Sequence, residues 1–155
     1  MDAAMRNEAV SILEAGKDLT VATLRADGGP QATTVSYASE GLTIYFGCDA
    51  RSQKAQNLAR DDRVSVTVNL PYGHWNEIRG LSAGGRAHRI TDPRETARVG
   101  SLFLKKFSPE IEAYLSPNGG ELALFRLEPQ VISLLDYRQG FGHTDLVRVD
   151  EFIGA

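Results

Sequence analysis

The six residues Asp49–Lys54 bring together a hydroxyl and two cationic side chains, a combination suited to binding an anion. Ser52 is a favourable N-cap, and an apolar i, i+3, i+4 pattern predicts a helix from Ser52 to Arg60. The expected buried stripe of this helix is Ala55, Leu58 and Ala59. A helix N-terminus offers free N–H groups and a positive dipole end, to which Arg51 and Lys54 add charge-assisted donors. The segment predicts a phosphate site, with a capped surface helix and two solvated cations as the alternative.

Two other segments contain residue types that are used in catalysis. Gly80–Gly84 matches the G-x-S-x-G pattern of a nucleophile elbow, which requires a strand, a sharp turn and then a helix. The residues that follow, Gly85–Ile90, continue a strand pattern, so we do not expect a serine hydrolase. His143 is the one weak candidate for a catalytic residue, as a proton donor. The alternative is a loop in which Phe141 docks into the core and His143 faces solvent.

Composition narrows the class of protein. The chain has 155 residues, a net charge of −3 and 42% hydrophobic residues, which predicts one globular domain over residues 1–155 and excludes a basic nucleic-acid binder. Cys48 is the only cysteine, so no internal disulfide forms, and the three histidines are too far apart for metal-ligand spacing. With neither a long apolar run nor a signal-peptide pattern, we expect a cytoplasmic protein without bound metal.

Local patterns predict the elements that must position these residues. Besides the helix at 52–60, helices are expected over Ala3–Ala15, ended by Gly16 as its C′ residue, and from Asp92, with Pro93 and Glu95 in its first turn. The buried stripe of the latter helix is expected at Val99, Leu102, Phe103 and Phe107. Strands are expected over Leu19–Leu24, Gln31–Ala38, Leu42–Phe46, Val64–Asn69, Ile78–Ile90, Leu122–Leu127 and Val131–Leu135.

Turns and interruptions complete this pattern. Gly84–Gly85 predicts a bulge, Pro129 separates the last two strands, and Pro117–Gly120 predicts a loop. Residues 1–16 form an N-terminal helix and residues 137–155 a C-terminal tail. Consecutive strands joined by tight turns predict a mainly β (α+β) fold, in which an antiparallel sheet of six to seven strands closes into a small barrel with about three peripheral helices.

The stretch LTIYFGCDARSQKAQNLARDDRVSVTV resembles the flavin-binding core of the pyridoxamine 5′-phosphate oxidase-like split-barrel family. The family pattern is a strand, a short loop, Ser-x-Lys at a helix start, then Asn-Leu, Asp-x-Arg-Val and an alternating strand. Lys54, Asn57-Leu58 and Asp62-Arg63-Val64 fall in register with it. The resemblance extends from about Leu19 to Ile90 and implies an FMN-binding split β-barrel.

The resemblance also implies site residues. Ser52 and Lys54 would hold the FMN phosphate, with Cys48 and Asp49 in the preceding loop; Gln53 replaces the usual arginine, whose charge Arg51 can supply. The flavin ring would lie along the second strand, at Thr33, Thr34, Val35 and Ser36. Family members are homodimers with flavin at the interface, so Arg79 and Ser82 would belong to a second wall contributed by the partner chain, with Trp75 nearby.

The function implied is a flavin-dependent oxidoreductase that acts on a small molecule. Tyr137, Arg138 and His143 do not reproduce the C-terminal Trp and Arg/His groups with which the oxidases bind the substrate phosphate, so the substrate stays open. Three alternatives also stay open: a deazaflavin-dependent reductase, a haem-binding or haem-degrading relative with His143 or His88 as axial ligand, and a non-catalytic flavin-binding protein.

Overall fold

The structure is a computed structural model that describes residues 1–111 and 121–149. Its elements in chain order are α1 (Ala3–Ala15), β1 (Asp18–Leu24), β2 (Pro30–Glu40), β3 (Thr43–Asp49), α2 (Gln53–Arg60), β4 (Arg63–Asn69), η1 (Trp75–Glu77), β5 (Arg79–Arg89), α3 (Pro93–Phe107), β6 (Leu122–Asp136), η3 (Tyr137–Gln139) and β7 (Thr144–Arg148). The loop predicted at Pro117–Gly120 lies outside the described residues. The predicted mainly β composition with three α-helices is confirmed.

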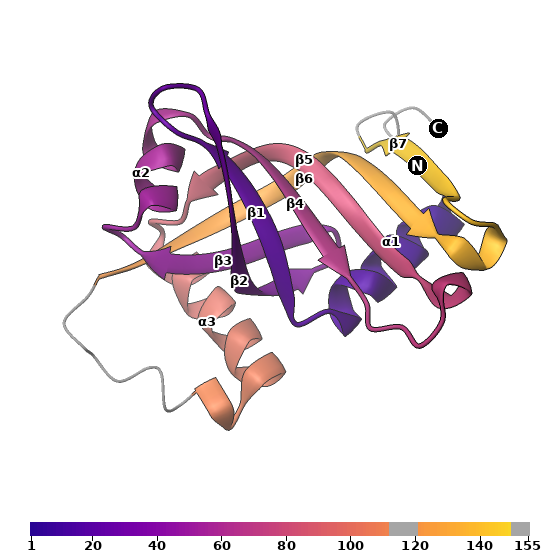
Figure 1. Cartoon of the computed structure of the whole chain (residues 1–155). Helices are drawn as coiled ribbons and strands as arrows, with labels where there is room; N and C mark the ends of the chain where they lie inside the picture. Colours follow the sequence, from indigo (N-terminus) through magenta and orange to yellow (C-terminus); the bar gives the residue numbers. More distant parts are fainter. Residues whose placement is uncertain (112–120, 150–155) are drawn as a thin grey trace.

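The seven strands form one antiparallel sheet in the order β3-β2-β1-β4-β5-β6-β7 (Figure 1). β3 also pairs with β6, so six strands close into a barrel and β7 extends the sheet beside β6. The predicted antiparallel barrel is therefore confirmed.

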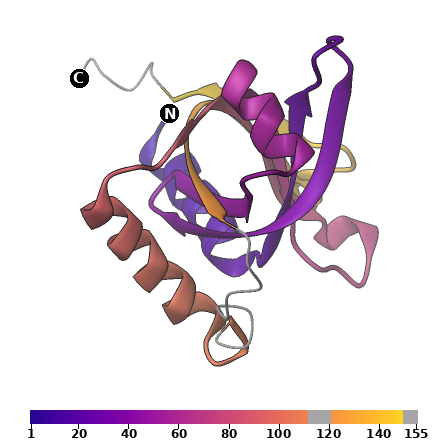
Figure 2. The same ribbon diagram turned by 90° about the vertical axis from the view of Figure 1, so that its left-hand side faces the viewer.

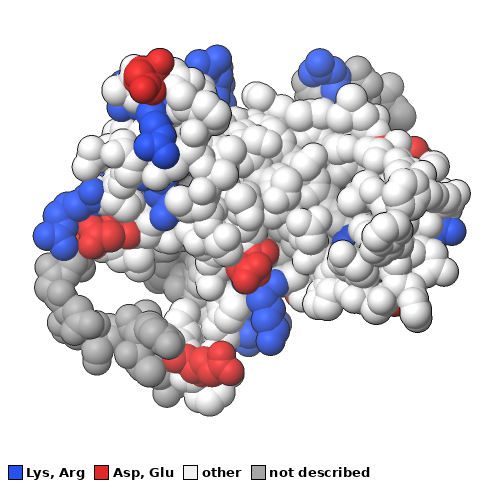
Figure 3. Space-filling view, in the orientation of Figure 1, with Lys and Arg blue, Asp and Glu red and all other residues white. Residues whose placement is uncertain are grey.

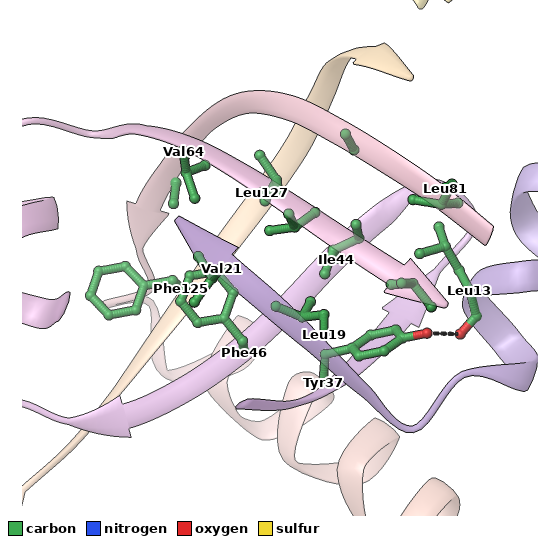
Figure 4. Packing of buried hydrophobic residues seen from close by; sticks show 14 of the residues in the cluster. Leu13, Leu19, Val21, Tyr37, Ile44, Phe46, Val64, Leu81, Phe125 and Leu127 are labelled. Atoms are coloured by element: carbon green, nitrogen blue, oxygen red, sulfur yellow. Dashed lines mark hydrogen bonds between the residues drawn. The ribbon is translucent and has the colours of Figure 1, made fainter. Parts of the chain in front are cut away.

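The core lies inside this barrel because alternate residues of each strand point inward. β4 alternates between exposed and buried residues over its whole length, with Val64, Val66 and Val68 inside. Figure 4 shows side chains from several strands meeting there, among them the stacked rings of Phe46 and Phe125, whose centroids are 5.4 Å apart. The interior is thus filled by side chains, and a ligand must bind elsewhere.

The three helices cover different parts of the barrel. Figure 2 looks along it: α2 lies across the near end, α1 is at the far end, and α3 runs along the outside of the strands. α1 and α2 contribute buried residues to the main core, whereas α3 packs through a second cluster of Tyr45, Ile90 and Val99. Of the predicted α3 stripe only Val99 is fully buried, because the helix packs on the outer surface of the sheet. In the described part of the chain, no helix is long and apolar enough to cross a bilayer.

The prediction that Pro129 separates two strands is wrong. β6 runs without a break from Leu122 to Asp136. Gly84 pairs with Val131 and Gly85 with Pro129, so Gln130 is an extra residue on β6 and the register shifts at the predicted Gly84–Gly85 bulge. A proline lacks an N–H to donate, and a bulge is a position where a sheet tolerates that loss.

Gly16 ends α1 by a different mechanism from the one predicted. Its φ is −71°, an ordinary extended value, whereas a C′ glycine adopts positive φ. A Cβ at this position would lie 2.5 Å from the Tyr37 hydroxyl and 2.6 Å from Val68 Cγ1. Glycine is therefore required by the close approach of α1 to the barrel.

Candidate cofactor-binding site

The barrel is split between β2 and β3. The two strands pair only from Tyr37↔Phe46 to Glu40↔Thr43. Before Tyr37, β2 pairs with β1 alone, and after Phe46, β3 pairs with β6 alone. In the described chain, the edge of β2 before Tyr37 therefore has backbone N–H and C=O groups without a strand partner, and such groups can bind the polar edge of a ligand.

A cavity of about 520 Å³ lies at this split, beneath the C-terminal half of α3. This volume is within the range of small-molecule sites. The described residues that line it come from β2, β3, β6, α3 and the turn after α3: Val35, Ser36, Gly47, Gly100, Phe103, Leu104, Phe107, Glu110, Ile111, Leu122 and Leu124.

Of the four residues predicted on β2, two line the cavity and two do not. Val35 and Ser36 line the cavity. Thr34 is exposed on the outer face of the sheet, where it pairs with Thr20. Thr33 lies on the alternate side, and its hydroxyl oxygen is buried without a hydrogen-bond partner among the described residues.

β3 connects the cavity to the start of α2: Gly47 lines the cavity, and Ser52 follows five residues later in the chain. Cys48 is half-buried at the same end of β3. The Ser52 hydroxyl accepts a hydrogen bond from the N–H of Ala55 at 3.3 Å, which confirms its role as the N-cap. Lys54 follows in the first helical turn.

Arg51, in contrast, is bound to Asp49. The Arg51 N–H donates to the Asp49 carboxylate at 2.8 Å, and its guanidinium Nη2 lies 3.2 Å from the other carboxylate oxygen. These hydrogen bonds lower the pKa of Asp49 below its ordinary value. Both side chains are largely exposed. Arg51 therefore carries a compensated charge beside the site, and Lys54 is the stronger candidate for holding an anion.

Gln53 belongs to a hydrogen-bond network around Asn57 that the sequence did not reveal. Asn57 is fully buried; its amide oxygen accepts from Gln53 Nε2 at 2.8 Å, and its amide nitrogen donates to Thr23 and Gln31, both at 3.0 Å. The predicted position for Ala59 in the buried stripe is wrong: Ala59 is exposed and Asn57 takes that face. The network fastens α2 to β1 and β2 and so sets the position of its N-terminus.

The remaining predicted residues lie on β5 and between η3 and β7; the start of β5, η3 and β7 are at the opposite end of the barrel from α2 (Figure 1). The Arg79 guanidinium donates to Glu8 of α1 at 2.7 and 2.9 Å. Ser82 lies midway along β5, between Thr67 and Ser133. The ring Nε2 of His143 is 3.0 Å from the Asp145 carboxylate. Within one chain these residues are therefore not brought to the cavity.

Aromatic side chains cluster near His143. The ring of Phe141 is 5.2 Å from that of Tyr137 and 6.0 Å from that of Trp75. Phe141 is 79% exposed and Trp75 68%. The alternative in which Phe141 docks into the core is therefore wrong.

One outer face of the sheet is nearly free of charge. Five residues with short hydroxylated side chains pair in one line across neighbouring strands: Thr34, Thr20, Thr67, Ser82 and Ser133. Figure 3 shows the surface over β1, β4 and β5 as mostly white, with Lys, Arg, Asp and Glu gathered toward its margins. No α-helix of the described chain covers this face (Figure 1). A flat, uncharged surface of short side chains is suited to close contact with a second surface.

Metal ligation has no support in the described chain, where no group of three His, Cys, Asp or Glu side chains is placed to hold an ion.

Comparisons with known proteins agree with this fold. The heme binding protein of Mycobacterium smegmatis superposes with a TM-score of 0.80 at 21% identity, over 98% of this chain and 60% of its own. A conserved hypothetical protein of Mycobacterium tuberculosis gives 0.75 at 26% identity, over 97% and 94% of the two chains. The heme storage protein HutZ of Vibrio cholerae gives 0.65 at 19%, over 77% and 85%. This chain thus spans 60% of the length of the M. smegmatis protein, which is less than two thirds.

A search of curated proteins finds no sequence match. The family model described as pyridoxamine 5′-phosphate oxidase matches residues 5–136, which include every strand of the closed barrel, the split and α2. The chain belongs to the pyridoxamine 5′-phosphate oxidase family.

Proposed function

We propose that this protein binds FMN at the split between β2 and β3 and uses it as an oxidoreductase cofactor for a small molecule. The single observation that carries the proposal is the split itself, where the edge of β2 before Tyr37 is unpaired and β3 leads directly into the N-terminus of α2, with the 520 Å³ cavity beside it. The unpaired edge of β2 suits the polar edge of the flavin, because hydrogen bonds there need only backbone groups. The Ser52 hydroxyl, the Lys54 ammonium and the free N–H groups of α2 suit the phosphate.

In this proposal the protein's own residues bind and orient the cofactor. FMN when bound supplies hydride and electron transfer. Lys54 and the first turn of α2 hold its phosphate, the Asn57 network keeps α2 in place, and Val35 and Ser36 position the ring. The proposal gives His143 no catalytic role, because the segment between η3 and β7 that contains it lies at the opposite end of the barrel from α2 (Figure 1).

We further infer that the functional unit is a homodimer formed through the uncharged face. A closed dimer uses the same patch twice, so the patch must be self-complementary. A face without charges and with short side chains avoids like-charge repulsion against its own copy. A two-fold axis that runs parallel to the strands near the middle of this face would bring the β5–β6 side of one chain, with Ser82, opposite the β2 side of the other. This supports Ser82 as part of a second wall, whereas Arg79 is already paired with Glu8.

The proposal is tested by titrating purified protein with FMN and with riboflavin, which lacks the phosphate, and following flavin fluorescence. We expect Lys54→Ala to weaken FMN binding by about tenfold and riboflavin binding little, because it removes one charge-assisted contact. Arg51→Ala should have a smaller effect, since Asp49 already holds the guanidinium. Lys105→Ala, on an exposed position of α3, is the charge-matched control. Equal losses for both ligands in the Lys54 and Arg51 double variant would remove phosphate recognition from the proposal.

Haem is the second candidate, because of the names of the M. smegmatis protein and HutZ. The apolar and aromatic cavity lining suits a porphyrin face. None of the histidines His74, His88 and His143 is among the described residues that line the cavity. A histidine ligand for haem in this cavity would thus have to come from a second subunit. A Soret band on addition of haemin, with no binding of FMN, would favour haem over flavin.

A further inference from the structure

The lining of the cavity differs from what a phosphorylated substrate requires. Seven of its described lining residues are large and apolar: Val35, Phe103, Leu104, Phe107, Ile111, Leu122 and Leu124. Among the described lining residues, only Ser36 and Glu110 have polar side chains. Burying a phosphate among such residues would leave its charge without cationic partners, at a large cost in free energy.

One lysine of α3 lies close to this lining without belonging to it. The Lys106 ammonium is 3.7 Å from the centroid of the Tyr37 ring and 5.5 Å from that of the cavity-lining Phe107, and Lys106 is not among the described lining residues. Its nitrogen is buried and has no hydrogen-bond partner in the described chain. Glu110 is therefore the single charged side chain in the described lining, and its negative charge repels anions.

The helix that forms the outer wall has a glycine where a side chain would fill the cavity. Gly100 lies in the interior of α3, where glycine destabilises a helix by about 1 kcal/mol relative to alanine. A Cβ built on Gly100 has no neighbouring atom within 4 Å in the described chain, so a larger residue at this position would not collide with its neighbours there. The open space continues into the cavity that Gly100 lines.

Two aromatic rings lie next to Gly100. Phe103 and Phe107 are one helical turn apart, with ring centroids 6.1 Å apart and an interplanar angle of 25°. Both line the cavity. Aromatic rings in a cavity wall are suited to stacking or edge contacts with an aromatic, and therefore planar, molecule.

We propose that the cavity is a substrate pocket for a planar, apolar molecule that is neutral or cationic and carries no phosphate, held between α3 and the ring-binding strand β2. The inference rests on the proposed flavin site, because it assigns the space under α3 to substrate and the edge of β2 to the cofactor. Gly100 leaves room for the molecule, Phe103 and Phe107 provide aromatic contacts, and the negative charge of Glu110 disfavours anions. This specificity differs from that for a phosphorylated pyridoxamine.

The test uses two fluorescent probes that differ by one group. N-phenyl-1-naphthylamine is neutral, and 8-anilinonaphthalene-1-sulfonate is the same molecule with a sulfonate. We expect the neutral probe to bind at least about tenfold more tightly than the sulfonated one, because none of the described lining side chains is a cation that could pair with the sulfonate. Gly100→Leu should weaken neutral-probe binding by about tenfold or more by filling the space. Ser101→Leu, on the exposed side of α3, is the matched control and should bind as the natural protein does.

Folding and charge are checked in the same series. Gly100→Leu should keep or raise the melting temperature, since leucine is the better helix former and meets no atom at its Cβ. Glu110→Lys should bring the sulfonated probe to within a few-fold of the neutral one. Equal affinity for the two probes in the natural protein, or unchanged neutral-probe binding in Gly100→Leu, would overturn the inference.

The two proposals fail in different ways. The titrations are run on the protein alone and on protein saturated with FMN, and we expect the neutral probe to bind in both. If FMN does not bind, but the neutral probe binds and Gly100→Leu weakens this binding, the flavin proposal fails while the proposed pocket for an apolar molecule is supported. If FMN binds and displaces the probe, the cavity belongs to the cofactor itself, and the substrate pocket is overturned.

Discussion

The hydroxyl of Tyr37 on β2 donates a buried 2.7 Å hydrogen bond to the carbonyl oxygen of Leu13 in α1 (Figure 4). Leu13 lies in the last turn of α1, where carbonyl groups lack an intrahelical partner. This bond therefore satisfies a helix end and holds α1 against the open end of the barrel. The two residues are 24 positions apart, and Gly16 is the position that lets them approach.

Removing this hydroxyl should destabilise the fold. We expect Tyr37→Phe to lower the free energy of unfolding by about 1–2 kcal/mol, because a buried carbonyl loses its donor. Gly16→Ala should cost about 1–3 kcal/mol, because the added Cβ collides with Tyr37 and Val68. Urea denaturation followed by circular dichroism measures both. Tyr72→Phe, at an exposed tyrosine, should leave stability unchanged; an equal loss there would mean that the Tyr37 bond is not the cause.

Asn57 is expected to link stability to cofactor binding. Asn57→Ala leaves the amide of Gln53 and the hydroxyl of Thr23 without their partner, and we expect a loss of about 2–3 kcal/mol. Because the same bonds fasten α2, FMN binding should weaken in the variant at temperatures where it is still folded. Chemical denaturation and flavin titration measure the two effects. Ala59→Ser changes an exposed residue of the same helix and should affect neither.

Lys106 predicts a dependence of stability on alkaline pH. Burial lowers the pKa of its ammonium from 10.5 to about 8. Between these values the unfolded chain binds more protons than the folded chain, so the contribution of Lys106 to stability rises as pH increases from about 8 to about 10.5. Below pH 8 the cost of burying the charge is fully present. Burial also raises the pKa of the Tyr37 hydroxyl, so this tyrosine keeps its proton throughout that window.

The variant that tests this dependence is Lys106→Met, which has a side chain of similar length without the charge. At pH 7 we expect it to be more stable than the natural protein by roughly 1 kcal/mol, allowing for the partial exposure of the lysine. The difference should shrink as pH rises toward 10. Urea midpoints at pH 7, 8.5 and 9.5 give the comparison, and a difference that stays constant with pH would contradict a buried, titrating ammonium.

Thr67, at the centre of the uncharged face, tests the proposed homodimer. Thr67→Arg brings a charge onto the patch, and in a two-fold interface each substitution is present twice. We expect the molecular mass from light scattering to fall from dimer to monomer and FMN binding to weaken with it. Thr96→Arg, on the exposed side of α3, should do neither. A natural protein that is monomeric at all concentrations would contradict the interface.

Much of the architecture could be predicted because its signals are local. Asp92 caps α3 by accepting from the Arg94 N–H, with Pro93 in the first turn. Gly28 and Gly41, in the short turns that follow β1 and β2, adopt positive φ values of 84° and 59°. The strict alternation of β4 matches its burial residue for residue. Caps, turns and periodicity depend on neighbouring residues, so the sequence carries them directly.

The candidate site was predicted only in part, for a physical reason. The Ser52–Lys54 motif is contiguous, and it opens α2 as expected. Asn57 reads as one more polar residue of a helix; only its partners 26 and 34 positions away reveal it as buried. Glu95, expected in the first turn of α3, forms an ion pair with Arg126, and Arg79 pairs with Glu8, 71 positions away.

The sequence by itself therefore determined most of the helices and strands, the N-caps of α2 and α3 and the motif that opens α2. Only the tertiary structure decided that β6 continues through Pro129 opposite the bulge at Gly85. The tertiary structure also decided that β2 before Tyr37 separates from β3 after Phe46 and that Gly100 of α3 lies over the resulting cavity. Strand register and helix docking are selected by contacts between segments far apart in the chain, which no local pattern of residues records.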